Sequence, residues 1–423
     1  MEQVEPLRTL TSSTPILGRS DDVASQRTRL AAVALAGVCA FLALYAPQPL
    51  LPMLRTLFHT SAGQIGWTIS ATTLAVAISA PFAGLASDRF GRRPVILASL
   101  FGLAIPSMMA GAVSTLPALI AWRFVAGLFM PGIIASTLAY IAEEWSGRDA
   151  ARAVTLYVTG TVLGGFIGRM LTGILAEHGG WRLALSTLGA LTLIGAIGVA
   201  RWLPASKGHV RGNNEDMGIS CFRDHLRNPV LLATYAVGFS VLFSLVATFT
   251  YITFHLASAP YRLGPVGQGA LFFVYLLGLV VTPAAGPWMH RLGQRRMLSI
   301  AVLTASLGVL LTLAGPLWLI VAGLAICSSG VFICQAAASS FVGTAATTAR
   351  SAAAGLYVAF YYVGGSAGAV VPGELWNRFG WPGCVALIVA VQVLAGAIAW
   401  RYWRLDTEGD DLIVCLETPG SLQ

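Results

Sequence analysis

The sequence predicts an all-α membrane protein, with twelve transmembrane helices in two six-helix bundles related by a pseudo-two-fold axis. Three observations predict this fold: the composition, the number of long apolar segments and a repeat between the two halves of the chain. Of the 423 residues, 56% are hydrophobic and only 10% are charged, whereas an ordinary soluble domain carries about 25% charged residues. Since a helix needs roughly 20 apolar residues to cross a bilayer, the chain has room for about a dozen spans.

Twelve apolar segments near that length follow a polar start, which lacks the apolar core of a cleavable signal peptide. They lie at residues 29–53, 65–86, 94–113, 117–142, 152–176, 182–203, 229–257, 267–288, 297–315, 317–343, 351–375 and 382–402. The expected organisation is a disordered cytoplasmic tail (1–28), an N-terminal six-helix bundle (29–203), a cytoplasmic linker (204–228), a C-terminal six-helix bundle (229–403) and a cytoplasmic tail (404–423).

Lysine and arginine set the expected orientation, because these residues concentrate in cytoplasmic loops. With both termini and the linker placed inside, 20 of the 26 basic residues fall in cytoplasmic segments and 4 fall outside. The formal charge of +8 is therefore explained without a nucleic-acid partner. We expect a multi-pass protein of the inner (plasma) membrane with both termini in the cytoplasm.

Several function classes lack the residues that they need. The only lysine, Lys207, is followed by Gly208, so the Lys-Ser or Lys-Thr pair of a Walker A loop is missing. The six histidines form no HExxH pair and the six cysteines no CxxC pair, so the sequence indicates neither a metal site nor a cofactor. We find no cluster of catalytic residues, which disfavours a membrane-embedded enzyme. A transport-inactive sensor would be expected to carry a sizeable soluble domain.

The two halves repeat each other in the same order. Residues 84–93 (GLASDRFGRR) recur at 286–295 (GPWMHRLGQR), and residues 164–168 (GGFIG) recur at 364–368 (GGSAG). Two repeats in the same orientation are related by an axis along the membrane normal, as in secondary transporters that hold their substrate between the halves. In the second half, Gly364 and Gly368 are therefore expected to pack helices closely, as their counterparts do in the first.

The loop after the second apolar segment carries the most specific signal. Its glycines permit a tight turn, and its arginines can hold the cytoplasmic face and pair with the acidic residue. The motif residues are Gly84, Asp88, Arg89, Gly91, Arg92 and Arg93. In this loop, and over all twelve segments, the sequence resembles the major facilitator superfamily. The resemblance implies that Asp88 and its arginines lock the cytoplasmic gate when the protein faces outward; His290 replaces Asp88 in the second copy.

Two arginines fall inside predicted spans, where a charge is costly and usually faces a partner or a watery cavity. Arg123 is the first residue of the segment RFVAG. This segment resembles the fourth-span motif of the drug:proton antiporters, where the arginine is implicated in proton coupling. The structural alternative is that the Arg123 side chain snorkels to the outer surface. Arg169 follows Gly160, Gly164 and Gly168, a stripe suited to close helix packing. Drug exporters normally carry a Gly-Pro pair there, and in lacking it the chain resembles the YnfM-like branch of the superfamily.

Other polar and aromatic residues inside the spans are candidates for the wall of a central cavity. Tyr357 and Tyr361 are four residues apart and so share one helix face. Gln335 must find a partner in the bundle interior, and an interhelical hydrogen bond is its alternative role. Tyr45 and Gln48, in the phrase LYAPQPLLP that also resembles the YnfM-like branch, complete the candidates.

The sequence thus predicts a secondary active transporter that moves a small organic solute by alternating access, as a monomer in the lipid bilayer, with protons as the coupling ion. Two interior arginines without a deep carboxylate favour a small anionic or neutral solute, and the family resemblance favours export. A multidrug or cationic-dye:proton antiporter is the alternative. We expect Arg123→Ala and Arg169→Ala to keep the fold and to abolish coupled transport.

Overall fold

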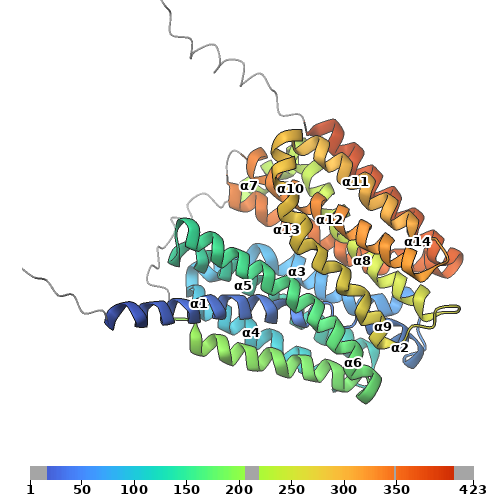
Figure 1. Ribbon diagram of the computed structural model, residues 1–423, viewed down its shortest axis with the longest axis horizontal. Coiled ribbons are helices and arrows are strands. Elements are labelled where there is room, and N and C mark those ends of the chain that lie inside the picture. The colour runs from blue at the N-terminus through green and yellow to red at the C-terminus, as the bar shows by residue number, and fades with distance from the viewer. Residues whose placement is uncertain (1–16, 205–218, 347–348, 404–423) are drawn as a thin grey trace, which may run out of the picture.

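In the computed structural model the chain is described at residues 17–204, 219–346 and 349–403 (Figure 1). Every regular element in these ranges is helical, which confirms the predicted all-α class. Nine of the described helices are long and apolar enough to cross a membrane. One of the nine, α6 (Gly147–Trp202), contains two spans because Gly180 breaks it. With α1 and α4, these helices account for the twelve predicted spans.

The N-terminal half consists of helices that run back and forth between the two ends of the molecule. They are α1 (Leu17–Leu42), η1 (Gln48–Leu50), α2 (Leu51–Leu57), α3 (Ala62–Phe90), α4 (Arg92–Met109), α5 (Leu116–Glu144) and α6. The first predicted span is interrupted after Leu42, because the prolines at 47, 49 and 52 cannot continue the α1 hydrogen-bond pattern. This interruption leaves the last carbonyl groups of α1 without helical partners.

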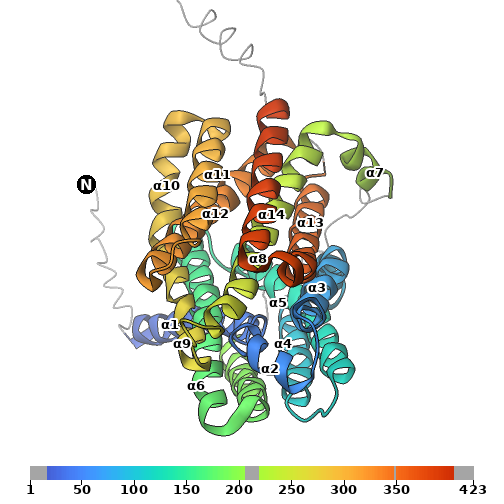
Figure 2. The ribbon, with the colours of Figure 1, turned by 90° about the vertical axis from the view of Figure 1, so that its right-hand side faces the viewer.

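The C-terminal half has the corresponding order of spans. Its elements are α7 (Ile219–Arg227), α8 (Pro229–Ala257), α9 (Pro265–Ala270), η2 (Leu271–Leu277), α10 (Gly278–Leu292), α11 (Gln294–Leu311), α12 (Leu317–Ala345), α13 (Arg350–Val370) and α14 (Pro372–Tyr402). Figure 2 shows most of the C-terminal helices above and the N-terminal helices below, with α9 of the C-terminal half reaching down beside α6.

Glycines end the helices at equivalent places in the two halves. Gly91 (φ 90°) separates α3 from α4, and Gly293 (φ 78°) separates α10 from α11. Gly180 (φ 81°) and Gly380 (φ 64°) break the long helices α6 and α14 in the same way. Side chains other than glycine rarely adopt positive φ, so these four positions fix where the chain turns back at the membrane surface.

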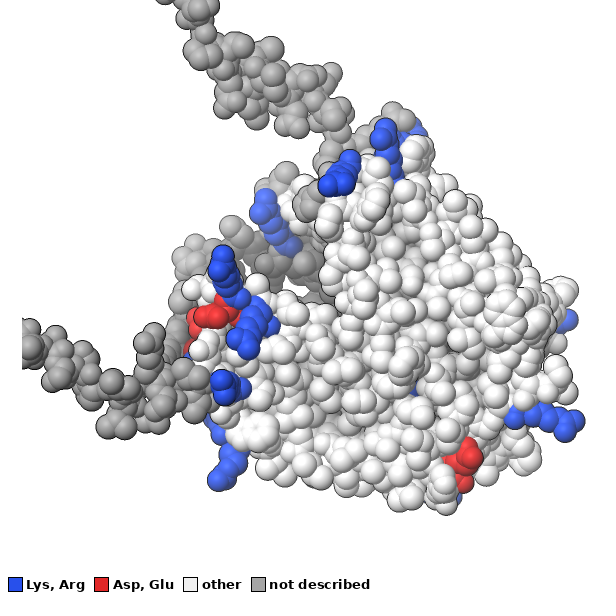
Figure 3. Space-filling view, viewed as in Figure 1, with Lys and Arg blue, Asp and Glu red and all other residues white. Residues whose placement is uncertain are grey.

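The two ends of the molecule differ in charge. Arginines gather at the end that holds the α3–α4 and α5–α6 junctions and the C-terminus of α6, where the blue side chains at the left of Figure 3 lie. We call this the basic end, and we call the opposite end, which holds Gly180 and Gly380, the far end. The ion pair between Arg29 and Glu144 ties the first helix to α5 at the basic end.

Helices extend into two segments that the sequence analysis assigned to a tail and a linker. α1 begins at Leu17, inside the segment 1–28 that was expected to be disordered, because each residue added to an existing helix gains a backbone hydrogen bond. α7 occupies the end of the linker 204–228. Residues 1–16, 205–218 and 404–423 lie outside the described residues, and the boundaries of the two bundles stay a prediction.

Candidate functional site

At the far end the two halves are sealed by close packing of α3 against α13. A methyl group added at Gly66 of α3 would lie 2.1 Å from the carbonyl oxygen of Ala369, so the two backbones touch. One helical turn further along, the hydroxyl oxygens of Ser70 and Ser366 are 2.6 Å apart, and both side chains are buried. Small side chains and a shared hydrogen bond therefore close the first of two seams between the halves.

The second seam joins α6 to α9 and η2. A methyl group added at Gly173 would lie 2.3 Å from the carbonyl oxygen of Pro265. The backbone N–H of Val266 donates to the Glu177 carboxylate at 3.2 Å. These residues carry no signal in the sequence, because a contact between the two halves leaves no periodic pattern in either helix.

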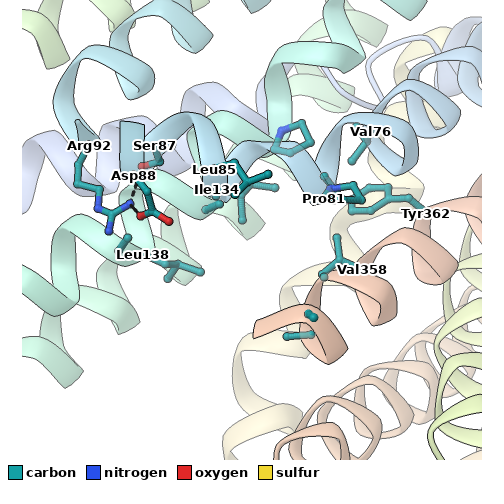
Figure 4. A pocket seen from close by; sticks show the side chains of 18 of the residues that line it. Val76, Pro81, Leu85, Ser87, Asp88, Arg92, Ile134, Leu138, Val358 and Tyr362 are labelled. Atoms are coloured by element: carbon teal, nitrogen blue, oxygen red, sulfur yellow. Dashed lines mark hydrogen bonds and ion pairs between the residues drawn. The ribbon is translucent and has the colours of Figure 1, made fainter. Parts of the chain in front are cut away.

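Toward the basic end the halves separate and enclose a cleft of about 560 Å³. Its walls come from α3 and α5 of the N-terminal half and from α13 of the C-terminal half. Figure 4 shows Val76 and Tyr362 at one end of the cleft and Asp88 with Arg92 at the other end, near the α3–α4 junction, which we call its mouth. The lining is mostly apolar, and the charged side chains of Asp88 and Arg92 lie together at the opening. The cleft therefore suits a small solute with a substantial apolar part.

Asp88 and Arg92 of the predicted gating motif meet at the mouth of the cleft. Arg92 Nη1 pairs with Asp88 Oδ1 at 2.5 Å, and Arg92 Nε donates to Glu143 Oε1 at 2.8 Å. All three residues belong to the N-terminal half, so this network stabilises one bundle while the basic end is open. Gly84 lines the same cleft.

The other two motif arginines lie apart from the mouth. Arg93 donates from Nε to the carbonyl oxygen of Leu203 at 2.6 Å and from Nη2 to that of Ala200 at 2.8 Å. It therefore satisfies carbonyl groups at the C-terminus of α6, where a positive charge is favourable. Arg89 is exposed, and its guanidinium lies 5.6 Å from the centre of the Phe90 ring.

Arg123 is buried, with 2% of its surface exposed. It donates from Nη1 to the carbonyl oxygen of Ala43 at 2.8 Å, from Nη2 to that of Leu44, and from Nε to that of Thr68 at 3.4 Å. Ala43 and Leu44 follow the last residue of α1, so Arg123 donates to carbonyl groups just beyond the point where the helix is interrupted. The Ala43 carbonyl oxygen also accepts from the backbone N–H of Ala46 at 3.4 Å. In this conformation the side chain acts within the N-terminal half and does not line the cleft.

Arg169 is also buried, at 3% exposed, but it lies on the boundary between the halves. Its Nε donates to Gln48 Oε1 at 2.8 Å, and its Nη1 donates to the carbonyl oxygen of Gly165 at 2.8 Å. Three rings surround the guanidinium carbon, with centres at 4.8 Å for Tyr45, 4.6 Å for Phe272 and 5.0 Å for Tyr275. No carboxylate among the described residues forms an ion pair with it.

The five predicted cavity residues fall into two groups. Tyr45 and Gln48 contact Arg169, and Gln48 Nε2 reaches Thr250 Oγ1 in the other half at 3.4 Å. The second group, in the C-terminal half, is Gln335, Tyr357 and Tyr361. Within the described residues, Gln335 Oε1 and the Tyr357 hydroxyl are buried without a hydrogen-bond partner, and the rings of Tyr357 and Tyr361 stack 6.3 Å apart.

None of these five residues lines the cleft that is open at the basic end; Tyr362, next to Tyr361, does. The sequence did not point to Phe272 and Thr250, which together with Tyr275 supply the contacts of the second half with Arg169 and Gln48. No three His, Cys, Asp or Glu residues in the described part of the chain gather in a way that could hold a metal ion.

The glycine stripes lie where helices of the same half approach most closely. Methyl groups added at Gly160, Gly164 and Gly168 would lie 2.4, 2.3 and 2.0 Å from backbone oxygens of α1. Methyl groups added at Gly364 and Gly368 would lie 2.1 and 2.5 Å from backbone oxygens of α8. The α1–α6 and α8–α13 contacts are thus built alike, which places Arg169 at the end of a rigid helix pair.

Comparison with known proteins identifies the family. The sequence profile of the Major Facilitator Superfamily matches residues 33–273 and 256–412. The chain belongs to this superfamily. Two similar proteins also match along most of their length. An uncharacterized transporter of Buchnera aphidicola (subsp. Schizaphis graminum) is 32% identical, and the alignment covers 85% of this chain and 88% of the relative. The inner membrane transport protein YnfM of Escherichia coli K12 is 31% identical, and the alignment covers 87% of this chain and 89% of YnfM.

Solved structures of superfamily members share the fold at low sequence identity. The nucleoside transporter NupG superimposes with a TM-score of 0.75 at 14% identity, covering 89% of this chain and 100% of that one. A bacterial homologue of the human lysosomal transporter Spinster, in an inward-facing and unoccupied conformation, gives a TM-score of 0.76 at 14% identity, covering 89% and 97%. These two likenesses show the shared fold, and the family match with its transporter relatives makes the protein a membrane transporter of the superfamily.

Proposed function

We propose that the protein is a secondary active transporter that moves a small organic solute across the inner membrane by alternating access, acting as a monomer. One observation carries the proposal: the halves are sealed along two seams at the far end and enclose a cleft at the basic end. We assign the basic end to the cytoplasm because lysine and arginine concentrate there. The described conformation is then inward-facing, with both termini in the cytoplasm.

The solute that this geometry favours is small and either anionic or neutral. The cleft is lined mostly by apolar side chains, and the interior cation nearest to the boundary between the halves, Arg169, has no carboxylate partner among the described residues. Protons are the proposed coupling ion, because the sequence has no nucleotide-binding loop. The family resemblance favours export. No chemical transformation of the solute is required, so we propose no enzymatic activity.

One observation favours a second candidate, a multidrug or cationic-dye:proton antiporter. The class C tetracycline resistance protein of Escherichia coli is 30% identical over 64% of this chain and 70% of its own. Proteoliposomes that contain a pH-sensitive dye distinguish the candidates when benzoate, xylitol and ethidium are added in turn. A proton signal with benzoate or xylitol that exceeds the signal in liposomes without the protein supports the proposal, because undissociated benzoic acid also carries protons across a bare bilayer. A signal above that control with ethidium alone supports the antiporter.

Alternating access predicts that the far-end seal must open in every cycle. Oxidation of the double variant Ser70→Cys/Ser366→Cys is expected to block transport, because the two hydroxyl oxygens are 2.6 Å apart and a disulfide between the halves would hold the seal closed. The measurement is solute flux in proteoliposomes before oxidation, after oxidation and after reduction.

Each single variant, treated with the same oxidant, is the control and should keep its flux. Reduction should restore the flux of the double variant. Undiminished transport by a protein shown to be cross-linked would contradict alternating access at this seam.

A further inference from the structure

We propose that Arg169 binds an anionic group of the solute, such as a carboxylate, only when the far end is open, and that Phe272 and Tyr275 displace this group when the far end closes. This inference rests on the proposed transport function and identifies the site at which an anionic solute is bound. In this proposal Phe272 and Tyr275, which are distant from Arg169 in the sequence, control whether an anion can bind at that site.

The partners of Arg169 divide between the two halves. Gln48 Oε1, the Gly165 carbonyl oxygen and the Tyr45 ring belong to the N-terminal half, as does Arg169 itself. The rings of Phe272 and Tyr275 belong to η2 of the C-terminal half. When the seam between α6 and η2 opens, the first group stays with Arg169 and the two rings leave.

The loss of these two rings exposes a cation that forms no ion pair with a carboxylate of the described residues. A guanidinium inside a membrane protein is costly unless it is paired or faces water. An aromatic face partly compensates the charge, but a carboxylate is a stronger partner, because it accepts two parallel hydrogen bonds from one guanidinium. Arg169 Nε and Nη1 are already held by Gln48 and Gly165, so the group is oriented before an anion arrives.

Gln48 supplies a second hydrogen-bond donor, which becomes free when the two halves separate. Its Nε2 reaches Thr250 Oγ1 of the C-terminal half at 3.4 Å, while its Oε1 accepts from Arg169. Separation of the halves breaks the contact with Thr250 and leaves the amide N–H groups free beside the guanidinium. The open site then presents both a cation and a neutral donor, the combination that recognises a carboxylate.

The backbone conformation of η2 is also one that is found in moving segments. Residues Leu271–Leu277 form a 3₁₀ helix in the middle of a span, between α9 and α10. A 3₁₀ stretch inside a helix often marks a hinge, because its hydrogen bonds have poorer geometry than those of an α-helix. Just before it, a methyl group added at Gly269 would lie 2.9 Å from the carbonyl oxygen of Arg169, so the end of α9 that leads into η2 lies directly against α6.

The test measures the binding of benzoate to the purified full-length protein by isothermal titration calorimetry, with benzamide as the uncharged analogue. In the double variant Phe272→Leu/Tyr275→Leu, side chains of apolar character remain but the aromatic faces are lost. We expect benzoate to bind this variant about tenfold or more tightly than the wild type, given the strength of cation–π contacts in desolvated sites. Adding Arg169→Gln to the double variant should abolish the gain.

Phe273→Leu is the matched control. Phe273 lies in the same element, but it is 64% exposed and its ring contacts Phe166, 5.5 Å away. Its substitution should leave benzoate binding unchanged. The thermal unfolding midpoint of each variant establishes that the protein is folded before binding is compared.

Two outcomes would overturn the inference. In the first, folded Phe272→Leu/Tyr275→Leu binds benzoate no more tightly than the wild type. In the second, benzamide gains affinity as much as benzoate, which would mean that the rings control access without regard to charge. Either outcome would leave the transport function intact if the Ser70–Ser366 cross-link still blocks flux, so the failure of this inference is distinguishable from the failure of the proposed function.

Discussion

Gly66→Ala is expected to hold the far end open and to reduce solute flux by about 5- to 150-fold, since overpacking of this kind typically costs about 1–3 kcal/mol and about 1.4 kcal/mol is a factor of ten in an equilibrium. The added methyl group would lie 2.1 Å from the carbonyl oxygen of Ala369, 3.1 Å from its carbonyl carbon and 3.7 Å from Val370 Cα. All of these atoms belong to α13. The substitution therefore disturbs the contact between the halves and leaves the packing inside each half unchanged.

The measurement combines flux in proteoliposomes with labelling of a cysteine at position 70 by a membrane-impermeant maleimide. Ser70 is 1% exposed in the sealed conformation, so Ser70→Cys alone should label slowly from the far side. Gly66→Ala/Ser70→Cys should label quickly. Slow labelling together with normal flux in the double variant would show that α3 and α13 can separate slightly without opening the seal, and would contradict the prediction.

Two other glycines give matched controls for Gly66→Ala. Gly343 of α12 has no atom within 4 Å of an added methyl group, so Gly343→Ala should preserve both flux and labelling. At Gly127 the added methyl group would lie 2.3 Å from the carbonyl oxygen of Thr72, which is in the same half. Gly127→Ala should therefore lower the thermal unfolding midpoint, whereas Gly66→Ala should not.

Arg123→Ala is expected to destabilise the N-terminal half by about 3 kcal/mol or more, because hydrogen bonds from a charged group contribute about 1.5–3 kcal/mol each. The variant would remove the donors to the carbonyl oxygens of Ala43, Leu44 and Thr68. This expectation replaces the one from the sequence, which was that the fold survives and only coupling is lost. The measurement is the thermal unfolding midpoint in detergent.

Arg378→Ala provides the comparison for Arg123→Ala. Arg378 forms an ion pair with Glu374, and both side chains are about two-thirds exposed, at 68% and 66%. An exposed pair of this kind contributes about 0–1 kcal/mol, so the unfolding midpoint should hardly change. If Arg123→Ala unfolds at the wild-type midpoint and loses only proton-coupled flux, the helix-end role of Arg123 is wrong and the coupling role from the sequence is right.

Much of the architecture was predictable because it depends on local chemistry. Apolar segments of bilayer length must be helical, since a helix satisfies its own backbone hydrogen bonds in lipid. The repeat predicted equivalent turns, and Gly91 and Gly293 both adopt the positive φ that glycine permits. The ion pair of Arg92 with Asp88 was predictable for the same reason, because the two residues are only four positions apart in the sequence.

The sequence by itself determined the helical class, the twelve spans, the repeat and the superfamily, because each depends on composition or on spacing within one segment. The tertiary structure decided what the two interior arginines do. Both are buried arginines inside a helix. Arg123 nevertheless donates to carbonyl groups of its own half, whereas Arg169 contacts the rings of Phe272 and Tyr275 across the boundary. The physical reason is that a buried charge takes its role from the partners that surround it, and those partners are brought together only by packing between helices far apart in the chain.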